Sequence, residues 1–302
     1  MSLDELRTLI ARHAGRSTAA VDGLLLSADH RPTPPRAGIA DPVLALVAQG
    51  SKRLVLGDRV YDYGAGQYLV VPLGLPVTGH VTQASSQRPL LGAGLALRPA
   101  VIASLLLETG SGRNSRAPSA AALAVSDAPA DLLDAVVRMV RLLDHPADAP
   151  VLAPMIEREI LWRLINGEQG ALVRQIGLAD SRVTQIGHAL RWIRDHYTEP
   201  LRVEDLARLS GMSPSPFHRH FRALTTMTPI QYQKQIRLQE ARLRLMSTTE
   251  DVADVGFAVG YDSASQFSRE YRRHFGLPPG QDAARLSAEP REVAGIGSPA
   301  PW

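Results

Sequence analysis

The sequence predicts an α+β protein in which a β-rich N-terminal domain is followed by an all-helical C-terminal domain. Between about 23 and 97, short apolar runs alternate with turn residues, a pattern typical of antiparallel strands. From about 181 to 278, apolar residues recur at helical spacing, and one helix–turn–helix pattern occurs twice. We place the domains at 1–175 and 181–280. We expect 281–302, which is rich in Pro, Gly, Ala and Ser, to be a disordered tail.

The N-terminal domain begins with a short amphipathic helix, which we expect at residues 3–14. The β-rich runs that follow read VLALVAQ, RLVLGDRVYDYG, QYLVVPLG and PVTGHVTQ. Gly57 and Asp58 lie between two β-rich segments, where a two-residue hairpin turn would join neighbouring strands. Because the runs recur at about ten-residue spacing, they predict a small antiparallel barrel or sandwich.

Helices are expected to flank this barrel at about 99–109, 131–144 and 154–167, with a flexible loop, GSGRNSRAPSA, after the first of them. The second and third helices carry apolar residues at helical spacing. Such a stripe either covers the barrel or pairs with a second copy of the protein, and the sequence leaves both interpretations open.

Composition narrows the class of protein. The formal net charge is only +3, although the sequence pI is about 9.4, and this balance does not establish an anionic partner. The absence of cysteine excludes disulfides, thiolate metal ligands and cysteine nucleophiles, and it fits a reducing cytosol. The N-terminus does not resemble a signal peptide. The most apolar stretch, 90–108, is interrupted by Arg98 and Pro99, so we expect a cytoplasmic protein without a membrane span.

The repeated pattern spans LARLSGMSPSPFHRHFRAL at 206–224 and VGFAVGYDSASQFSREYRRHF at 255–275. Each copy has a short apolar helix, a glycine, a capping serine and a second helix with an apolar stripe. The glycines are Gly211 and Gly260, the caps are Ser213 and Ser263, and the stripes are Phe217, Phe221 and Leu224, then Phe267, Tyr271 and Phe275. A basic helix, TPIQYQKQIRLQEARLRLM, joins the copies. This repetition favours two helix–turn–helix units over a helical bundle with a solvated arginine face.

The capping signals are specific in both copies. Pro214 follows Ser213 and suits the first turn of a helix. Gln266 stands three residues after Ser263, which is the spacing of a capping box. We expect Thr248 and Asp251 to form a similar box at the start of the second copy.

The polar side of each second helix, opposite its apolar stripe, predicts contact with DNA. An α-helix fits the major groove, where arginine pairs with guanine through two hydrogen bonds. We predict base contacts from Ser215, His218, Arg219, Ala264, Ser265, Ser268 and Arg269. We predict phosphate contacts, which set affinity and register, from Arg222, Lys234, Arg237, Arg272 and Arg273.

These residues resemble the DNA-binding domain of the AraC/XylS family of transcriptional regulators. The resemblance covers about 185–280, and VGFAVGYDSASQFSREYRRHFGLPP is its most specific part. It implies seven helices, with two helix–turn–helix units held by a linker helix and both reading adjacent major grooves. Ser215 and Ala264 are small where other members carry larger contact residues, and Pro216 lies in the first turn of its helix.

The N-terminal stretch ADPVLALVAQGSKRLVLGDRVYDYGAGQYLVVP resembles, less specifically, a cupin-like effector-binding or dimerisation domain of the same family. We predict an effector pocket lined by Tyr61, Tyr63, Tyr68 and His80. A cupin enzyme would need several histidines and a carboxylate around a metal, but this region offers only His30 and His80. We therefore expect no metal, no cofactor and no catalytic residue.

Together these inferences predict a sequence-specific DNA-binding transcription regulator controlled by a small effector or by dimerisation through its barrel. The expected partners are double-stranded DNA, a small molecule, RNA polymerase and a second copy of the chain. Two alternatives stay open: a ligand-free architectural or dimerising protein, and a metal-free barrel enzyme with a DNA-binding domain.

Overall fold

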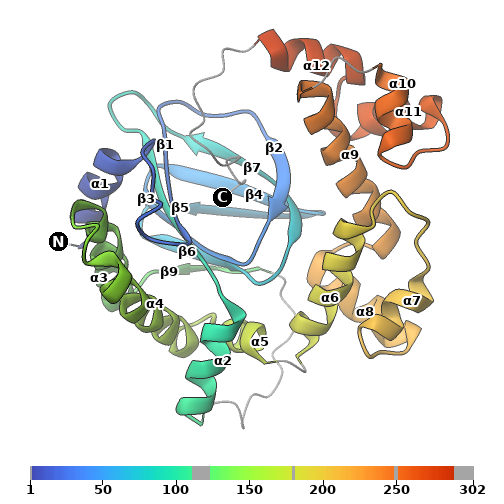
Figure 1. Cartoon of the computed structure of the whole chain (residues 1–302). Helices are drawn as coiled ribbons and strands as arrows, with labels where there is room; N and C mark the ends of the chain where they lie inside the picture. Colours follow the sequence, from blue (N-terminus) through green and yellow to red (C-terminus); the bar gives the residue numbers. More distant parts are fainter. Residues whose placement is uncertain (1, 111–122, 179–180, 248–250, 289–302) are drawn as a thin grey trace. The chain divides into compact units, whose positions relative to one another are not determined.

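The computed structural model describes residues 2–110, 123–178, 181–247 and 251–288 (Figure 1). It divides into two compact units, and the division falls within helix α6, between Gly187 and His188. The predicted boundary lay a few residues earlier, before this helix. No helix in the described ranges is long and apolar enough to cross a membrane.

The N-terminal unit contains two antiparallel sheets, as the alternation of apolar runs and turns predicted. In the described residues, one sheet has five strands in the order β1-β8-β3-β6-β9 and the other has four in the order β2-β7-β4-β5. The strands are β1 Leu24–Asp29, β2 Arg36–Ala40, β3 Val43–Gln49, β4 Ser51–Leu56, β5 Arg59–Gly64, β6 Gln67–Val71, β7 Leu75–Gln83, β8 Leu90–Ala96 and β9 Val125–Asp127.

The hairpin between β4 and β5 confirms the predicted two-residue turn. Leu56 pairs with Arg59, and Gly57 has a φ of 61°, a left-handed conformation that glycine adopts without steric cost. Along β4 the inward side chains of Lys52, Leu54 and Leu56 are buried, whereas Arg53, between the first two, is exposed. This strict alternation fixes which face of the four-stranded sheet points into the unit.

Helices cover the outer face of the five-stranded sheet (Figure 1). Helix α1 packs against β1, β3 and β8 and against α3, while α3 packs against α4 and α2 packs against α5. Their bounds are α1 Ser2–His13, α2 Pro99–Glu108, α3 Ala130–Arg141, the 3-10 turn η1 Leu142–Asp144, α4 Ala149–Asn166 and α5 Gly170–Gly177. The apolar stripe of α3 is buried within the N-terminal unit, where the helix packs against α1 and α4. Part of α4 differs, because Val151 and Met155 are exposed.

The C-terminal unit is helical throughout its described residues, and the two helix–turn–helix units are α7–α8 and α10–α11, joined by α9. The bounds are α6 Arg182–Asp195, α7 Val203–Leu209, α8 Pro214–Thr225, α9 Pro229–Ser247, α10 Val252–Ala258, α11 Ala264–Phe275 and α12 Pro279–Ala288. Both predicted aromatic stripes pack inward. The rings of Phe217 and Phe221 lie 5.5 Å apart, and Phe267 lies 5.6 Å from Tyr271.

The turns of the two helix–turn–helix units have some, but not all, of the predicted features. Gly211 and Gly260 both adopt positive φ, at 65° and 93°. Ser263 accepts a hydrogen bond from the backbone N–H of Gln266 at 3.4 Å, but Ser213 makes no side-chain cap bond, so a side-chain cap there was a wrong prediction. Asp251 also caps α10 without a side-chain bond, and its expected partner at 248 lies outside the described residues.

Part of the expected tail is ordered instead, because residues Pro279–Ala288 form helix α12. Asp282 in this helix is fully buried and accepts hydrogen bonds from Arg242, Arg285 and Tyr271. The segment is rich in Pro, Gly and Ala, and this composition led to the prediction of disorder. The helix is stabilised by contacts with distant residues, such as Arg242. The remaining residues, 289–302, lie outside the described part of the chain.

Thr226 is the C-cap of α8, and replacing it with glycine is expected to stabilise the C-terminal unit by about 0.5–1 kcal/mol. Thr226 has a φ of 62°, which is unfavourable for a β-branched residue, whereas Gly276 holds the same position after α11 with a φ of 83°. Urea denaturation of Thr226→Gly measures the gain. The reverse change, Gly276→Thr, should lower the unfolding free energy; equal stabilities for all three proteins would contradict the strain.

Candidate nucleic-acid interface

Helices α8 and α11 present equivalent positions. Both are 12 residues long and both follow a serine N-cap. Phe217 and Phe267 are the fourth residues of their helices and are fully buried. Arg219 and Arg269 therefore occupy the same helical position, two residues after the buried ring. The two copies expose the same chemical group at the same place in their second helix.

The predicted base-contacting residues are largely accessible. Exposed side chains are those of Ser215, His218, Arg219, Ser265 and Arg269, and half-buried ones are those of Ala264 and Ser268. The half-buried pair lies on α11, where small side chains leave the helix backbone close to any bound surface. The exposed set has the composition of a groove-reading face, with an arginine in each copy.

The five exposed arginines of these two helices form no ion pair within the described part of the chain; they are Arg219, Arg222, Arg269, Arg272 and Arg273. On the N-terminal unit, by comparison, Arg53, Arg98 and Arg138 pair with carboxylates. A guanidinium without an internal partner keeps its donors available for phosphate or guanine. The two second helices therefore carry five guanidinium groups that no described carboxylate neutralises.

Lys234, a predicted phosphate contact, is engaged within the protein. Its Nζ lies 2.8 Å from Oε1 of Glu270 on α11, and that carboxylate also accepts from the hydroxyl of Tyr261 and from Gln266. Burial alone would raise the pKa of Glu270. The hydrogen bonds from Lys234, Gln266 and Tyr261 outweigh this effect and hold the pKa below its usual value. This pair ties the linker helix α9 to α11.

Arg237 does not fit the phosphate role that its position on the basic helix predicted. Its Nε donates to the carbonyl of Tyr197 at 2.6 Å, and its Nη1 donates to the carbonyl of Gly260 at 2.6 Å. Its Nη2 donates to the carbonyls of Thr198 and Glu199, each at 3.2 Å. The guanidinium is therefore a structural clamp between the end of α6 and the turn of the second helix–turn–helix unit. Local periodicity could not reveal backbone acceptors so distant in sequence.

The four predicted effector-pocket residues do not lie on one surface. Tyr61 and Tyr63 point into the N-terminal unit, because they pair with the inward-facing Leu54 and Lys52. His80 pairs with Arg53, so it lies on the outer face of the same sheet. A single pocket formed by all of these side chains is therefore excluded by the strand register.

Tyr68 lies on the helix-covered side of the five-stranded sheet. It is 2% exposed, and its hydroxyl lies 3.6 Å from the position that a Cβ of Gly167, at the end of α4, would occupy. Burial raises its pKa above the ordinary tyrosine value. Tyr68 is thus a core residue, and only Tyr61 and Tyr63 of the predicted set face the interior between the sheets.

One interior residue was missed by the sequence analysis. Lys52 is 8% exposed and lies on the inward face of β4, opposite Tyr63. The alternation in SKRLVL was the available signal, because Lys52 shares its parity with Leu54 and Leu56.

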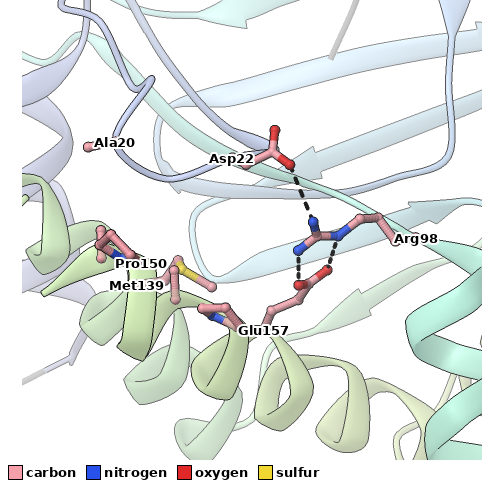
Figure 2. Close-up of a pocket in the computed structure, with 9 residues that line it drawn as sticks. Ala20, Asp22, Arg98, Met139, Pro150 and Glu157 are labelled. Atoms are coloured by element: carbon pink, nitrogen blue, oxygen red, sulfur yellow. Dashed lines mark hydrogen bonds and ion pairs between the residues drawn. The ribbon is translucent and has the colours of Figure 1, made fainter.

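A small pocket of about 150 Å³ lies where the N-terminal segment meets α4 (Figure 2). Arg98 lines this pocket and donates hydrogen bonds to both carboxylate oxygens of the buried Glu157. It also donates to Asp22 at 3.3 Å. Because these charges pair with one another, as Figure 2 shows, the pocket offers no free cation to a ligand. The described residues also contain no group of three or more His, Asp and Glu arranged to hold a metal ion.

Comparison with known protein families gives matches in both units. Residues 20–172 match the AraC-type transcriptional regulator N-terminus, and residues 206–285 match a helix-turn-helix domain. The second match ends within α12, in agreement with the ordered structure beyond 281.

Curated regulators are similar to about half of this chain. The chain is 31% identical over 146 residues to the transcriptional activator RhaS of Klebsiella pneumoniae, covering 48% of this chain and 50% of RhaS. It is 26% identical over 151 residues to the uncharacterised regulator YdeC of Bacillus subtilis, covering 49% of this chain and 51% of YdeC. The chain thus spans about half the length of the curated relatives that it matches.

Among solved structures, ToxT from Vibrio cholerae has a similar fold. One crystal structure gives a TM-score of 0.58 at 11% identity and covers 88% of this chain and 100% of ToxT. A ToxT structure with bound unsaturated fatty acid gives a TM-score of 0.54 at 9% identity, covering 86% of this chain and 93% of that one. At these identities the likeness concerns the fold.

Proposed function

Because the chain belongs to the family of AraC-type transcriptional regulators, we propose that it binds specific double-stranded DNA through α8 and α11 and regulates transcription. The observation that carries this proposal is the pair of equivalent, exposed and internally unpaired arginines, Arg219 and Arg269. Exposed donors at one position of two recognition helices suit two guanines in successive major grooves. The base and phosphate contacts belong to this proposal, with Arg237 and Lys234 reassigned to structural support.

We also propose that the N-terminal unit binds a small effector. The effector would lie between the two sheets of this unit, against their inward-facing side chains. ToxT, which shares the fold, binds an unsaturated fatty acid, and this supports a small-molecule role for the corresponding unit here. The effector would shift the balance between arrangements of the units that differ in DNA affinity. We expect this regulator to work in the cytoplasm, to act on RNA polymerase and to catalyse no reaction.

A homodimer is part of the same proposal. Val151 and Met155 on α4 are 68% and 63% exposed, and Leu152 beside them is 40% exposed. A contiguous apolar surface of this kind suits a second copy of the chain, since exposed apolar patches mark association sites. Sedimentation of Met155→Glu should show a monomer at concentrations where the unchanged chain is a dimer; equal sedimentation of the two proteins would remove α4 from the interface.

Replacing Arg269 with alanine should abolish preference at one base pair and weaken specific binding by about 1–3 kcal/mol. The matched change is Arg273→Ala, four residues further along the same helix and also exposed. This change should weaken binding to all DNA sequences alike. It should also lower the salt dependence of binding by the amount expected for about one phosphate contact. Gel-shift titrations on a selected site and on single-base variants, at several salt concentrations, separate the two effects. Unchanged base preference in Arg269→Ala would place the reading face elsewhere.

A further inference from the structure

Lys52 is a buried cation in the interior of the N-terminal unit. The residue is 8% exposed, on the inward face of β4. Its side chain crosses from the four-stranded sheet to the five-stranded one, because a Cβ built on Gly92 of β8 would lie 4.0 Å from Nζ. The ammonium group is therefore held between the two sheets, where water is largely excluded.

The protein supplies little to balance this charge. Nζ donates to the hydroxyl of Ser27 at 3.5 Å, the long limit of a hydrogen bond, and no described carboxylate forms an ion pair with it. Burial lowers the pKa of Lys52 to about 8, while the charge of Asp29 acts in the opposite direction. At neutral pH the amine is thus mostly protonated, and a buried charge without a close counterion is costly.

Two neighbouring features point to a ligand in the same interior. The hydroxyl of Tyr61 is buried and has no hydrogen-bond partner in the described chain, and its residue shares the inward face of β5 with Tyr63, opposite Lys52. Leu25 lies on the inward face of β1, with the same parity as Ser27, and yet it is 38% exposed. The interior therefore offers a cation, a free phenol donor and an apolar side chain that solvent reaches.

We propose that the space between the two sheets binds a small organic monocarboxylate, whose acidic group pairs with Lys52 and whose apolar body lies toward Leu25. The inference rests on the proposed effector role of the N-terminal unit and specifies the chemistry of that effector. A single buried ammonium balances one negative charge, which favours a carboxylate over a phosphate that carries nearly two. The hydroxyl groups of Ser27 and Tyr61 are the neutral donors beside it.

The test measures the thermal shift of the full chain with octanoate, benzoate and phenylacetate, beside their neutral primary amides. At least one acid should raise the melting temperature of the unchanged chain, and its amide should not. In Lys52→Met and Lys52→Gln the same acid should bind about ten- to a hundred-fold more weakly, the loss expected for a charged hydrogen bond. Lys234→Met is the matched control, since Lys234 is the other lysine of the chain and pairs with Glu270, and it should keep the shift.

Two outcomes would overturn the assignment. In the first, none of the acids stabilises the unchanged chain more than its amide does; in the second, the acid-dependent shift persists in both Lys52 variants. DNA binding is titrated on the same proteins. Intact specific binding with a failed acid test removes only the ligand class, whereas absent DNA binding in the unchanged chain removes the proposed function itself.

Discussion

Replacing Asp282 with alanine is expected to destabilise the C-terminal unit by about 2–3 kcal/mol, because the change leaves the half-buried Arg242 and the buried hydroxyl of Tyr271 without their acceptor. The Asp282 carboxylate is fully buried. It accepts from Nε of Arg242 on α9 at 2.9 Å, from Arg285 at 2.9 Å and from the hydroxyl of Tyr271 on α11 at 2.9 Å. One carboxylate thus joins three helices, including α11, which is proposed to read DNA.

The measurement is urea denaturation of Asp282→Ala, with Asp205→Ala as control. Asp205 pairs with Arg208 at 3.1 Å on the surface, where both side chains are more than half exposed, so its loss should cost about 1 kcal/mol or less. A loss for Asp282→Ala no larger than for the control would show that α12 is not part of the cooperative unit.

The same carboxylate predicts a dependence on pH. Burial alone would raise the pKa of Asp282, but the hydrogen bonds from Arg285, Arg242 and Tyr271 outweigh it and hold this pKa below the ordinary carboxyl value. The folded state therefore binds this proton less readily than the unfolded state does. The stabilisation is complete at neutral pH, above the unfolded pKa, and is lost as the pH falls through the lowered folded pKa. Asp282→Ala should lack this acid-dependent component.

Lys52→Met is expected to raise the unfolding free energy of the ligand-free N-terminal unit by about 3 kcal/mol at pH 7. Methionine keeps the apolar stem of the side chain and removes the charge that burial disfavours. Since the folded pKa is lowered from 10.5 to about 8, the cost of the lysine is fully present below about pH 8 and vanishes as the pH approaches 10.5.

Urea denaturation of both proteins at several pH values between neutral and alkaline measures the difference. The gain in unfolding free energy from Lys52→Met should shrink steadily through this pH range. Asp29, Tyr61 and Tyr63, which face Lys52 or act on its charge, are present in both proteins, so their own titration is common to the two curves. A variant that is less stable than the unchanged chain at pH 7 would show that the ammonium is satisfied within the fold.

Local patterns predicted much of this fold. The four-residue spacing of Phe267, Tyr271 and Phe275 placed these rings on the inner side of α11, and Gly57 marked a hairpin. Both follow from chemistry contained within one helix or one turn. Strand β9 was missed because three residues carry too short a pattern, and it forms only by pairing with β6.

The failed site predictions share another cause. The role of Arg237 depends on backbone carbonyls such as that of Gly260, which lies 23 residues away along the chain, and no local pattern encodes such a partner. The predicted pocket of Tyr61, Tyr63, Tyr68 and His80 failed as a single cluster, because strand register decides which face a side chain occupies. The exposure of Arg219 and Arg269, in contrast, followed directly from their helical distance to a buried ring.

Selection of bound sequences from random DNA by the purified full chain tests the central claim most directly, that both α8 and α11 read DNA. The account predicts one enriched site with two half-motifs about one helical turn, roughly 10 base pairs, apart. Arg219→Ala should erase the preference for a base in one half-motif, and Arg269→Ala should erase it in the other. A single motif that is lost in only one of these variants, or enrichment without any sequence preference, would contradict it.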